Sequence, residues 1–216
     1  MITSDSDSGL AQLDALGDVG LPHDAREKLV AYLDLLAKWN GTYNLTAIRD
    51  RARMITHHVL DSLAVLPHLR ETGDSGGLSL LDVGSGGGVP ALPIAIARPG
   101  WRVVALDSNH KKGAFLQQAA SELALTNVEA VVARVEDYRP EALFDVVISR
   151  AFSDLATFAE SSARHLAAGG ILVAMKGVRP DEEIAQLASA FRVVAMHALA
   201  VPGIDAARHL IVIEPA

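Results

Sequence analysis

One aspartate followed by three alternating glycines is the most chemically informative stretch of this sequence. The four residues are Asp82, Gly84, Gly86 and Gly88. They lie between an apolar run at 78–83 and a helix-like run at 91–98. Glycine lets the backbone adopt positive φ angles and approach a ligand closely. A strand, a glycine turn and a helix in this order are typical of a nucleotide-like ligand bound at the carboxyl end of the strand.

Two of the three ligands that such a turn commonly holds fit this sequence poorly. A phosphate-binding loop requires lysine and then serine or threonine, and this pair does not follow Gly88 at the required spacing. A dinucleotide fingerprint is matched formally from Gly86 to Ala91. Pro90 and Pro93, however, remove amide donors near the point where a pyrophosphate would bind. An NAD-binding dehydrogenase is therefore the weaker alternative.

Acidic residues after three successive predicted strands favour the third ligand, S-adenosylmethionine. This molecule carries an ammonium and a sulfonium group, and the carboxylate of Asp82 suits that positive end. Asp107 ends the second predicted strand, where a carboxylate can accept hydrogen bonds from both ribose hydroxyls, a feature that NAD binding shares. Glu136 follows the third predicted strand, where it would meet the adenine amino group. We therefore expect S-adenosylmethionine as the cofactor.

The spacing of apolar side chains predicts the elements that position these residues. Apolar residues recur at intervals of three and four in 24–40 and 51–68, which predicts two helices. From residue 78 the pattern changes to short apolar strands that alternate with helices. The predicted strands are 78–83, 102–107, 128–133, 144–149, 171–176, 191–199 and 209–214. The further predicted helices are 91–98, 110–124, 154–167 and 181–190.

This alternation predicts an α/β fold, a parallel sheet with helices on both faces. The connection between the last two of the seven strands contains Pro202 and Gly203, which favours a terminal hairpin. The segment 71–77 has the composition of a linker. We therefore predict a single structural unit with two parts, an N-terminal helical cap at 1–72 and a sheet domain at 73–216.

Composition limits the classes of protein to which this chain could belong. Half of the 216 residues are hydrophobic and none is cysteine, which excludes disulfides, thiolate metal sites and cysteine nucleophiles. The net charge of −7 argues against a general nucleic-acid coat protein, although a local basic patch is compatible with contact at one structured RNA site. The polar, acidic start lacks the features of a signal peptide, and no apolar run has membrane-spanning length. We expect a cytoplasmic monomer without a membrane partner.

The methyl acceptor can be narrowed by elimination. Carbon methylation of a pyrimidine usually needs a cysteine, which the chain lacks. Exocyclic amine methylation usually needs an Asn-Pro-Pro-Tyr-like turn, but residues 149–152 read Ser-Arg-Ala-Phe. Lys176 and Glu214 could serve ribose methylation, yet the aspartate of that catalytic set is absent after the fourth strand. Acceptors that need no deprotonation fit best, and guanine N7 is the obvious one because its lone pair is free.

Eight segments together resemble a known family. They are 38–50, 57–65, 80–99, 106–116, 134–137, 144–152, 175–177 and 208–213. In this order they look like the bacterial small-subunit ribosomal RNA guanine-N7 methyltransferases, also called glucose-inhibited division protein B. The resemblance covers nearly the whole chain. It implies a class I S-adenosylmethionine-dependent methyltransferase fold, Rossmann-like with an N-terminal helical extension. The acceptor that it implies is a guanine in the decoding-region loop of 16S rRNA, within the small ribosomal subunit.

The resemblance also implies which residues contact the donor. By position these are Gly84, Val89, Val135, Glu136 and Arg150. The pattern of acids and glycines adds Asp82, Gly86, Gly88 and Asp107 to that set. Arg150 ends the fourth predicted strand, where strand ends form the site, so we expect it to align the partners and support the reaction electrostatically. No general base is expected.

Basic residues around the predicted donor site are candidates for contact with rRNA. They are Arg51, Arg53, His57, Lys111, Lys112, Lys176 and Arg208. The adjacent pair His57 and His58 does not predict a metal site, because neighbouring helical residues point to different faces and no third ligand has a suitable spacing. A methyltransferase of another RNA or of a small molecule, and a binding module without turnover, are alternatives.

Overall fold

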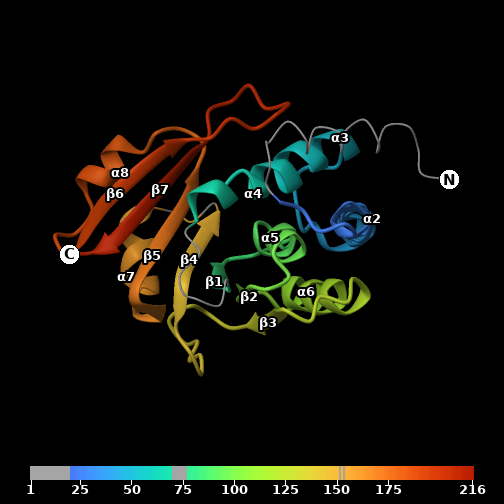
Figure 1. The fold of residues 1–216 in the computed structure, drawn as a ribbon, viewed down its shortest axis with the longest axis horizontal. Helices are drawn as coiled ribbons and strands as arrows, with labels where there is room; N and C mark the ends of the chain where they lie inside the picture. Colours follow the sequence, from blue (N-terminus) through green and yellow to red (C-terminus); the bar gives the residue numbers. More distant parts are fainter. Residues whose placement is uncertain (1–19, 70–76, 151, 153) are drawn as a thin grey trace.

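The computed structural model describes residues 20–69, 77–150, 152 and 154–216 (Figure 1). Residue 72, where the sequence divides cap from sheet domain, lies outside these ranges, as does the predicted linker except for Gly77. The division at 72/73 therefore stays a prediction. Within the described ranges, no helix is long and apolar enough to cross a membrane.

A seven-stranded sheet forms the centre of the molecule. Its strands are β1 (Ser79–Val83), β2 (Arg102–Asp107), β3 (Val128–Val132), β4 (Phe144–Arg150), β5 (Leu166–Lys176), β6 (Phe191–Ala198) and β7 (His209–Pro215). They are arranged in the order β3-β2-β1-β4-β5-β7-β6. The first five run parallel, and β7 pairs antiparallel with β5 and β6. The predicted seven strands and terminal hairpin are confirmed, and the chain reverses its direction of winding between β1 and β4.

Helices cover both faces of the sheet. They are α2 (Ala25–Tyr43), α3 (Arg51–Met54), η2 (Ile55–Leu60), α4 (Asp61–Leu63), η3 (Leu66–His68), α5 (Ala91–Ala97), α6 (His110–Glu122), α7 (Leu155–Ser162), η4 (Ala163–His165) and α8 (Asp181–Ala185). In Figure 1, α2, α5 and α6 lie on one side of the sheet, and α7 and α8 on the other. Side chains alternate between the faces, so Leu80 belongs to one apolar cluster and Leu81 to the other. Strands buried on both faces explain the continuous apolar runs in the sequence.

Three predicted helices differ from the sequence expectation. The helix expected over 181–190 is shorter, since α8 ends at Ala185. The helix expected over 154–167 ends at Ser162, and β5 already begins at Leu166, which pairs with Phe144 of β4. A Cβ on Gly170 would lie 2.8 Å from the carbonyl oxygen of Phe144, so glycine allows this close pairing. The helix expected over 51–68 exists but is not uniform, because η2 is a π-helical turn. Such turns occur frequently at functional sites.

Helix α2, at the start of the cap, contacts the glycine turn directly. The buried hydroxyl of Tyr32 on α2 donates a hydrogen bond of 2.7 Å to the carbonyl oxygen of Gly87. Leu36, one turn later, packs so closely that a Cβ on Gly87 would lie 3.0 Å from its Cδ1 atom. The helical extension therefore sets the position of the turn and does not merely cover it.

Asp82 ends up beneath the same turn, fully buried. Its Oδ2 atom accepts a hydrogen bond of 3.2 Å from the backbone N–H of Ala91 at the start of α5. Its Oδ1 atom has no hydrogen-bond partner among the described residues. Burial raises the pKa of Asp82 to about 7, against the opposing effects of the nearby Ser85 hydroxyl and of the hydrogen bond from the Ala91 N–H. The folded protein therefore holds this carboxyl protonated at pH values where an exposed one ionises.

Replacing Tyr32 with phenylalanine tests the fastening of cap to turn. Tyr32→Phe leaves a buried carbonyl without this donor, so we expect the free energy of unfolding to fall by about 1–3 kcal/mol. Denaturant unfolding measures the change, and Tyr43→Phe is the control because Tyr43 is 42% exposed. Equal stability of the two variants would contradict the proposed role of the bond.

The protonated state of Asp82 predicts a pH dependence of stability. Between about pH 4 and pH 7 the unfolded chain loses the Asp82 proton while the folded protein keeps it. The free energy of unfolding should therefore fall with rising pH, by up to about 1.4 kcal/mol per pH unit for this one proton. Asp82→Asn removes this contribution, so its stability relative to the wild type should increase from pH 4 to pH 8. Parallel stability profiles of the two proteins would show that Asp82 is ionised when folded.

Candidate functional site

Two cavities open at the carboxyl ends of the parallel strands. The first has a volume of about 350 Å³ and is lined by Val83, Gly84, Leu106, Asp107, Ser108, Lys112, Ala133, Arg134, Val135, Glu136 and Phe152. The second has a volume of about 460 Å³ and is lined by Thr46, Ala47, Ile48, His57, His58, Asp61, Arg150, Met175, Lys176, Gly177, Leu199, Arg208 and His209. Both lie near the reversal of strand order between β1 and β4, where open α/β sheets bind their ligands.

The glycine turn forms one wall of the first cavity. The backbone N–H groups of Gly84 and Ser85 donate to the carbonyl oxygen of Leu106 at 2.8 and 3.0 Å, which ties the turn to the end of β2. Gly84 has φ +80° and open space around its missing Cβ, so a ligand can approach its backbone. Gly88 has φ +83°, and a Cβ there would lie 2.5 Å from Leu92 Cδ1, so its role is packing of α5.

Asp107 is held rigidly at the end of β2. Its Oδ1 atom accepts from the backbone N–H of Asn109 at 2.9 Å, and its Oδ2 atom accepts from that of Gly86 at 3.0 Å. Lys112 lies 3.5 Å from Oδ2. The carboxylate is nearly buried yet lines the cavity, so its remaining lone pairs can accept from hydroxyl groups of a bound ligand.

The loop after β3 forms the opposite wall, and two residues of η4 hold it from behind. The carbonyl oxygen of Val135 accepts from Arg164 Nη2 and is 2.9 Å from His165 Nε2. Arg164 also donates to the carbonyl oxygen of Glu136. Burial lowers the pKa of His165, so the ring is neutral and its Nε2–H serves as the donor. Arg164 and His165 were not predicted from the sequence, because nothing in their spacing indicates contact with a loop about thirty positions earlier.

Only some of the predicted donor contacts line the first cavity. Four of them line the first cavity together, namely Gly84, Asp107, Val135 and Glu136. Gly86 and Gly88 shape the turn without lining it. Asp82 differs from the expectation, since the structure buries its carboxyl under the turn instead of presenting it to the cavity. Val89 is also buried, and Arg150 faces the second cavity. The assignment of these residues to a donor stays a prediction.

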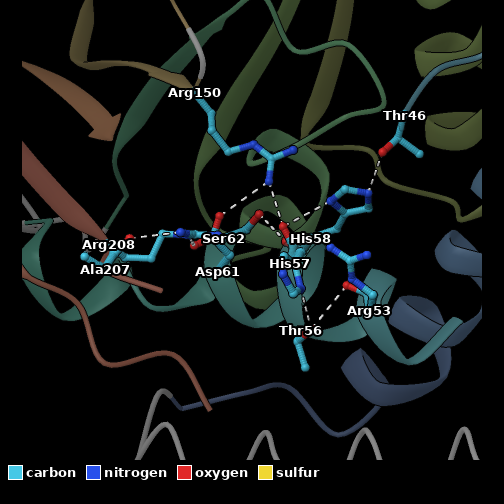
Figure 2. Close-up of polar contacts among 10 residues, drawn as sticks. All are labelled: Thr46, Arg53, Thr56, His57, His58, Asp61, Ser62, Arg150, Ala207 and Arg208. Atoms are coloured by element: carbon cyan, nitrogen blue, oxygen red, sulfur yellow. Dashed lines mark hydrogen bonds and ion pairs between the residues drawn. The ribbon is translucent and has the colours of Figure 1, made fainter. Parts of the chain in front are cut away.

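The second cavity collects basic residues from distant parts of the chain. Of the candidates for RNA contact, His57, Lys176 and Arg208 line it together with Arg150. The Lys176 ammonium lies 2.7 Å from Glu183 Oε2. Arg150 Nη1 donates to the carbonyl oxygen of His57 at 2.7 Å, which joins β4 to the π-helical turn (Figure 2). The cap and the sheet thus enclose this cavity jointly.

Two of the histidines that line this cavity, His57 and His58, have lowered pKa values and are uncharged near neutral pH. His58 Nε2 lies 3.0 Å from Thr46 Oγ1, and burial and then the charge of Arg150 lower the pKa of His58 to about 4. Burial, followed by the charge of Arg53, lowers the pKa of His57. Among the residues described, no group of three or more His, Cys, Asp or Glu side chains could hold a metal ion.

The remaining basic candidates do not line the second cavity. Arg51 is engaged within the cap, with an ion pair of 2.7 Å to Asp34 and a hydrogen bond to the carbonyl oxygen of Val30. This contact stabilises the packing of α3 on α2, and RNA contact by Arg51 stays a prediction. Arg53 is exposed, and Lys111 lies 5.9 Å from the centre of the Tyr43 ring. Lys112 pairs with Asp107 at the first cavity.

Known proteins resemble this chain in both sequence and fold. The family model of rRNA small subunit methyltransferase G (GidB) matches residues 25–211. The ribosomal RNA small subunit methyltransferase G of Laribacter hongkongensis (strain HLHK9) is 52% identical over 198 residues, 91% of this chain and 93% of that protein. Its counterpart from Burkholderia pseudomallei (strain 1106a) is 54% identical over 205 residues, 93% of this chain and 87% of that protein.

Solved structures confirm the predicted fold class. The glycopeptide N-methyltransferase MtfA complexed with S-adenosylmethionine aligns with a TM-score of 0.60 at 15% identity, over 72% of this chain and 87% of that one. A SAM-dependent methyltransferase from Aquifex aeolicus aligns with a TM-score of 0.55 at 18% identity, over 76% and 93%. The fold is the Rossmann-like methyltransferase fold. Because the family model and the relatives both match nearly the full length, this chain belongs to the rRNA small subunit methyltransferase G family.

Proposed function

We propose that this protein transfers a methyl group from S-adenosylmethionine to N7 of a guanine in 16S rRNA. The observation that carries the proposal is the first cavity, in which the ends of β1, β2 and β3 bring together Gly84, Asp107 and Glu136. Membership of the rRNA small subunit methyltransferase G family supports the choice of RNA as acceptor.

The residues of the first cavity fit S-adenosylmethionine. Its volume of about 350 Å³ lies within the range of small-molecule sites. Gly84 offers close backbone approach, Asp107 a fixed carboxylate for ribose hydroxyls, and Glu136 an acceptor for the adenine amino group. When bound, the donor supplies an electrophilic methyl group. The protein's own part is to hold that donor at the strand ends. Arg164 and His165 fix the loop after β3, which contains Glu136.

The chemistry of the second cavity supports an acceptor that loses no proton. Its two buried titratable groups are engaged: Asp61 by two arginines, and His58 by Thr46 and the His57 carbonyl. The lowered pKa of His58 makes it a weak base. Guanine N7 attacks through a free lone pair, so alignment and electrostatic support suffice.

The distribution of basic groups supports a structured RNA as the partner. The chain carries a net charge of −7, yet Arg150, Lys176 and Arg208 meet at one cavity, and Arg53 and Lys111 are exposed. We infer that a monomer recognises the small ribosomal subunit locally, in the bacterial cytoplasm where that RNA is found. In this proposal the cap at 1–72 and the domain at 73–216 each provide one side of the acceptor site.

Replacing Asp107 tests the donor site. Asp107→Asn removes a charged acceptor from the first cavity, so we expect the dissociation constant of S-adenosylhomocysteine to rise about tenfold or more. Isothermal titration calorimetry measures it, with Asp137→Asn as control, since Asp137 is exposed and does not line the cavity. Equal affinities for the two variants would remove Asp107 from the donor site.

Mapping the methylated base tests the acceptor. Small subunits from a strain that lacks this methyltransferase are incubated with the protein and labelled S-adenosylmethionine, and borohydride–aniline treatment then cleaves at N7-methylguanine. We expect one cleavage, in the decoding-region loop, which Gly84→Asp abolishes because a side chain at φ +80° is strained and occupies the donor space. Labelled RNA without cleavage would exclude N7 chemistry. Donor binding without any transfer to RNA would favour a small-molecule acceptor.

A further inference from the structure

A single buried carboxylate bridges the two arginines of the second cavity. Asp61 begins α4, and its side chain is only 4% exposed. Its Oδ1 atom lies 3.2 Å from Nε of Arg208, and its Oδ2 atom lies 3.4 Å from Nη1 of Arg150. Figure 2 shows the two guanidinium groups reaching Asp61 from different directions. Each carboxylate oxygen therefore serves one arginine.

The bridge joins three segments that are far apart in the sequence. Arg150 ends β4, 89 residues after Asp61, and Arg208 precedes β7, 147 residues after it. Arg150 also donates to the His57 carbonyl oxygen at 2.7 Å, so two acceptors on the same helix fix its guanidinium. Free arginine side chains have many rotamers, and these contacts restrict them before a substrate arrives.

The arginine pair keeps a net positive charge after its contact with Asp61. The Arg, Lys, Asp and Glu side chains of the cavity and its immediate partners are three cations, Arg150, Lys176 and Arg208, and two carboxylates, Asp61 and Glu183. His209 also lines the cavity, and its Nδ1 atom lies 3.1 Å from the carbonyl oxygen of Gly177. Glu183 lies 2.7 Å from Lys176 and offsets it, while Asp61 is shared by two arginines. With His57 and His58 uncharged, one net positive charge stays with the arginine pair. A phosphate of the RNA backbone has the complementary charge and suits a guanidinium geometrically.

We propose that Asp61 is a positioning residue, which aligns Arg150 and Arg208 to receive a phosphate beside the acceptor guanine. This inference rests on the proposed function. It assigns to Asp61 the alignment of the acceptor and not the binding of the donor, because Asp61 lines the second cavity and not the first. A buried carboxylate between two arginines also keeps their mutual repulsion from separating them.

Asp61→Asn separates positioning from charge. The substitution preserves shape but raises the net charge of the arginine pair by one, so RNA affinity should become more salt-dependent while alignment is lost. We expect kcat on small subunits to fall at least tenfold without an increase in KM at low salt. The slope of log KM against log salt concentration should steepen by about one, because one more counterion is released. The dissociation constant of S-adenosylhomocysteine should stay within about twofold of the wild type.

Arg208→Gln provides a second test that does not depend on a fully buried position, because the Arg208 side chain is 23% exposed. It should raise KM about tenfold and make the salt slope shallower by about one. In the double variant the two charge changes cancel, so the salt slope should return to about the wild-type value. Asp24→Asn is the matched control on the cap. It breaks an ion pair of 2.8 Å with Lys28, Asp24 being 54% exposed, and should leave every parameter unchanged.

The outcomes distinguish the inference from the function on which it rests. Suppose that the wild type methylates guanine N7 and that Asp61→Asn has the same kcat and the same salt slope as the wild type. This result would overturn the proposed role of Asp61 and leave the proposed function intact. Loss of S-adenosylhomocysteine binding in either variant would also overturn it, because the bridge would then serve the donor site or the fold. A wild type that methylates no RNA would overturn both proposals together.

Discussion

Burial of both faces of a parallel sheet is the constraint on which the rest of this structure depends. The residues of β1 and β2 alternate between two apolar clusters, so neither face has space for a polar site. Functional groups can lie only at an edge, and the reversal of strand order between β1 and β4 opens the carboxyl edge. Every strand of the parallel part therefore delivers its last side chain, or the loop that follows, to the same place.

The helical cap completes that edge through a few polar contacts between distant segments. Tyr32 holds the glycine turn, and Asp61 and the His57 carbonyl hold the end of β4 through Arg150. These contacts lie at the border of a large apolar interface, where each buried polar group needs its partner. Apolar packing supplies most of the adhesion between cap and sheet, whereas the polar contacts determine the orientation. The geometry of the second cavity, which the cap and the sheet enclose together, therefore depends on those contacts.

The seven strands and the helical layers on both faces of the sheet could be predicted from the sequence because apolar runs report burial directly. Strand β5 begins earlier than predicted because Leu166, Ala167 and Ala168 favour a helix by local propensity, whereas pairing of Leu166 with Phe144 of β4 places the segment in the sheet. The role of Asp61 was missed for a different reason, since its partners are 89 and 147 residues away. Asp82 was expected to face a ligand, but the sequence does not tell whether a strand-end carboxylate lies above or beneath the turn that follows it. Residue type indicates what chemistry a side chain can do, but only the fold determines where that side chain points.

The electrostatic arrangement of the two cavities fits the charge movement of the proposed reaction. Methyl transfer moves one positive charge from sulfur to the guanine ring, from the side with Asp107 and Glu136 to the side with Arg150 and Arg208. Two unit charges 5 Å apart at an effective dielectric constant of 20 repel by about 3 kcal/mol, so two uncompensated arginines would oppose the reaction strongly. Asp61 offsets one of them, and a phosphate on the other would offset the rest. The charge of the arginine pair would then be offset only when RNA is bound, which would couple correct substrate binding to a lower barrier.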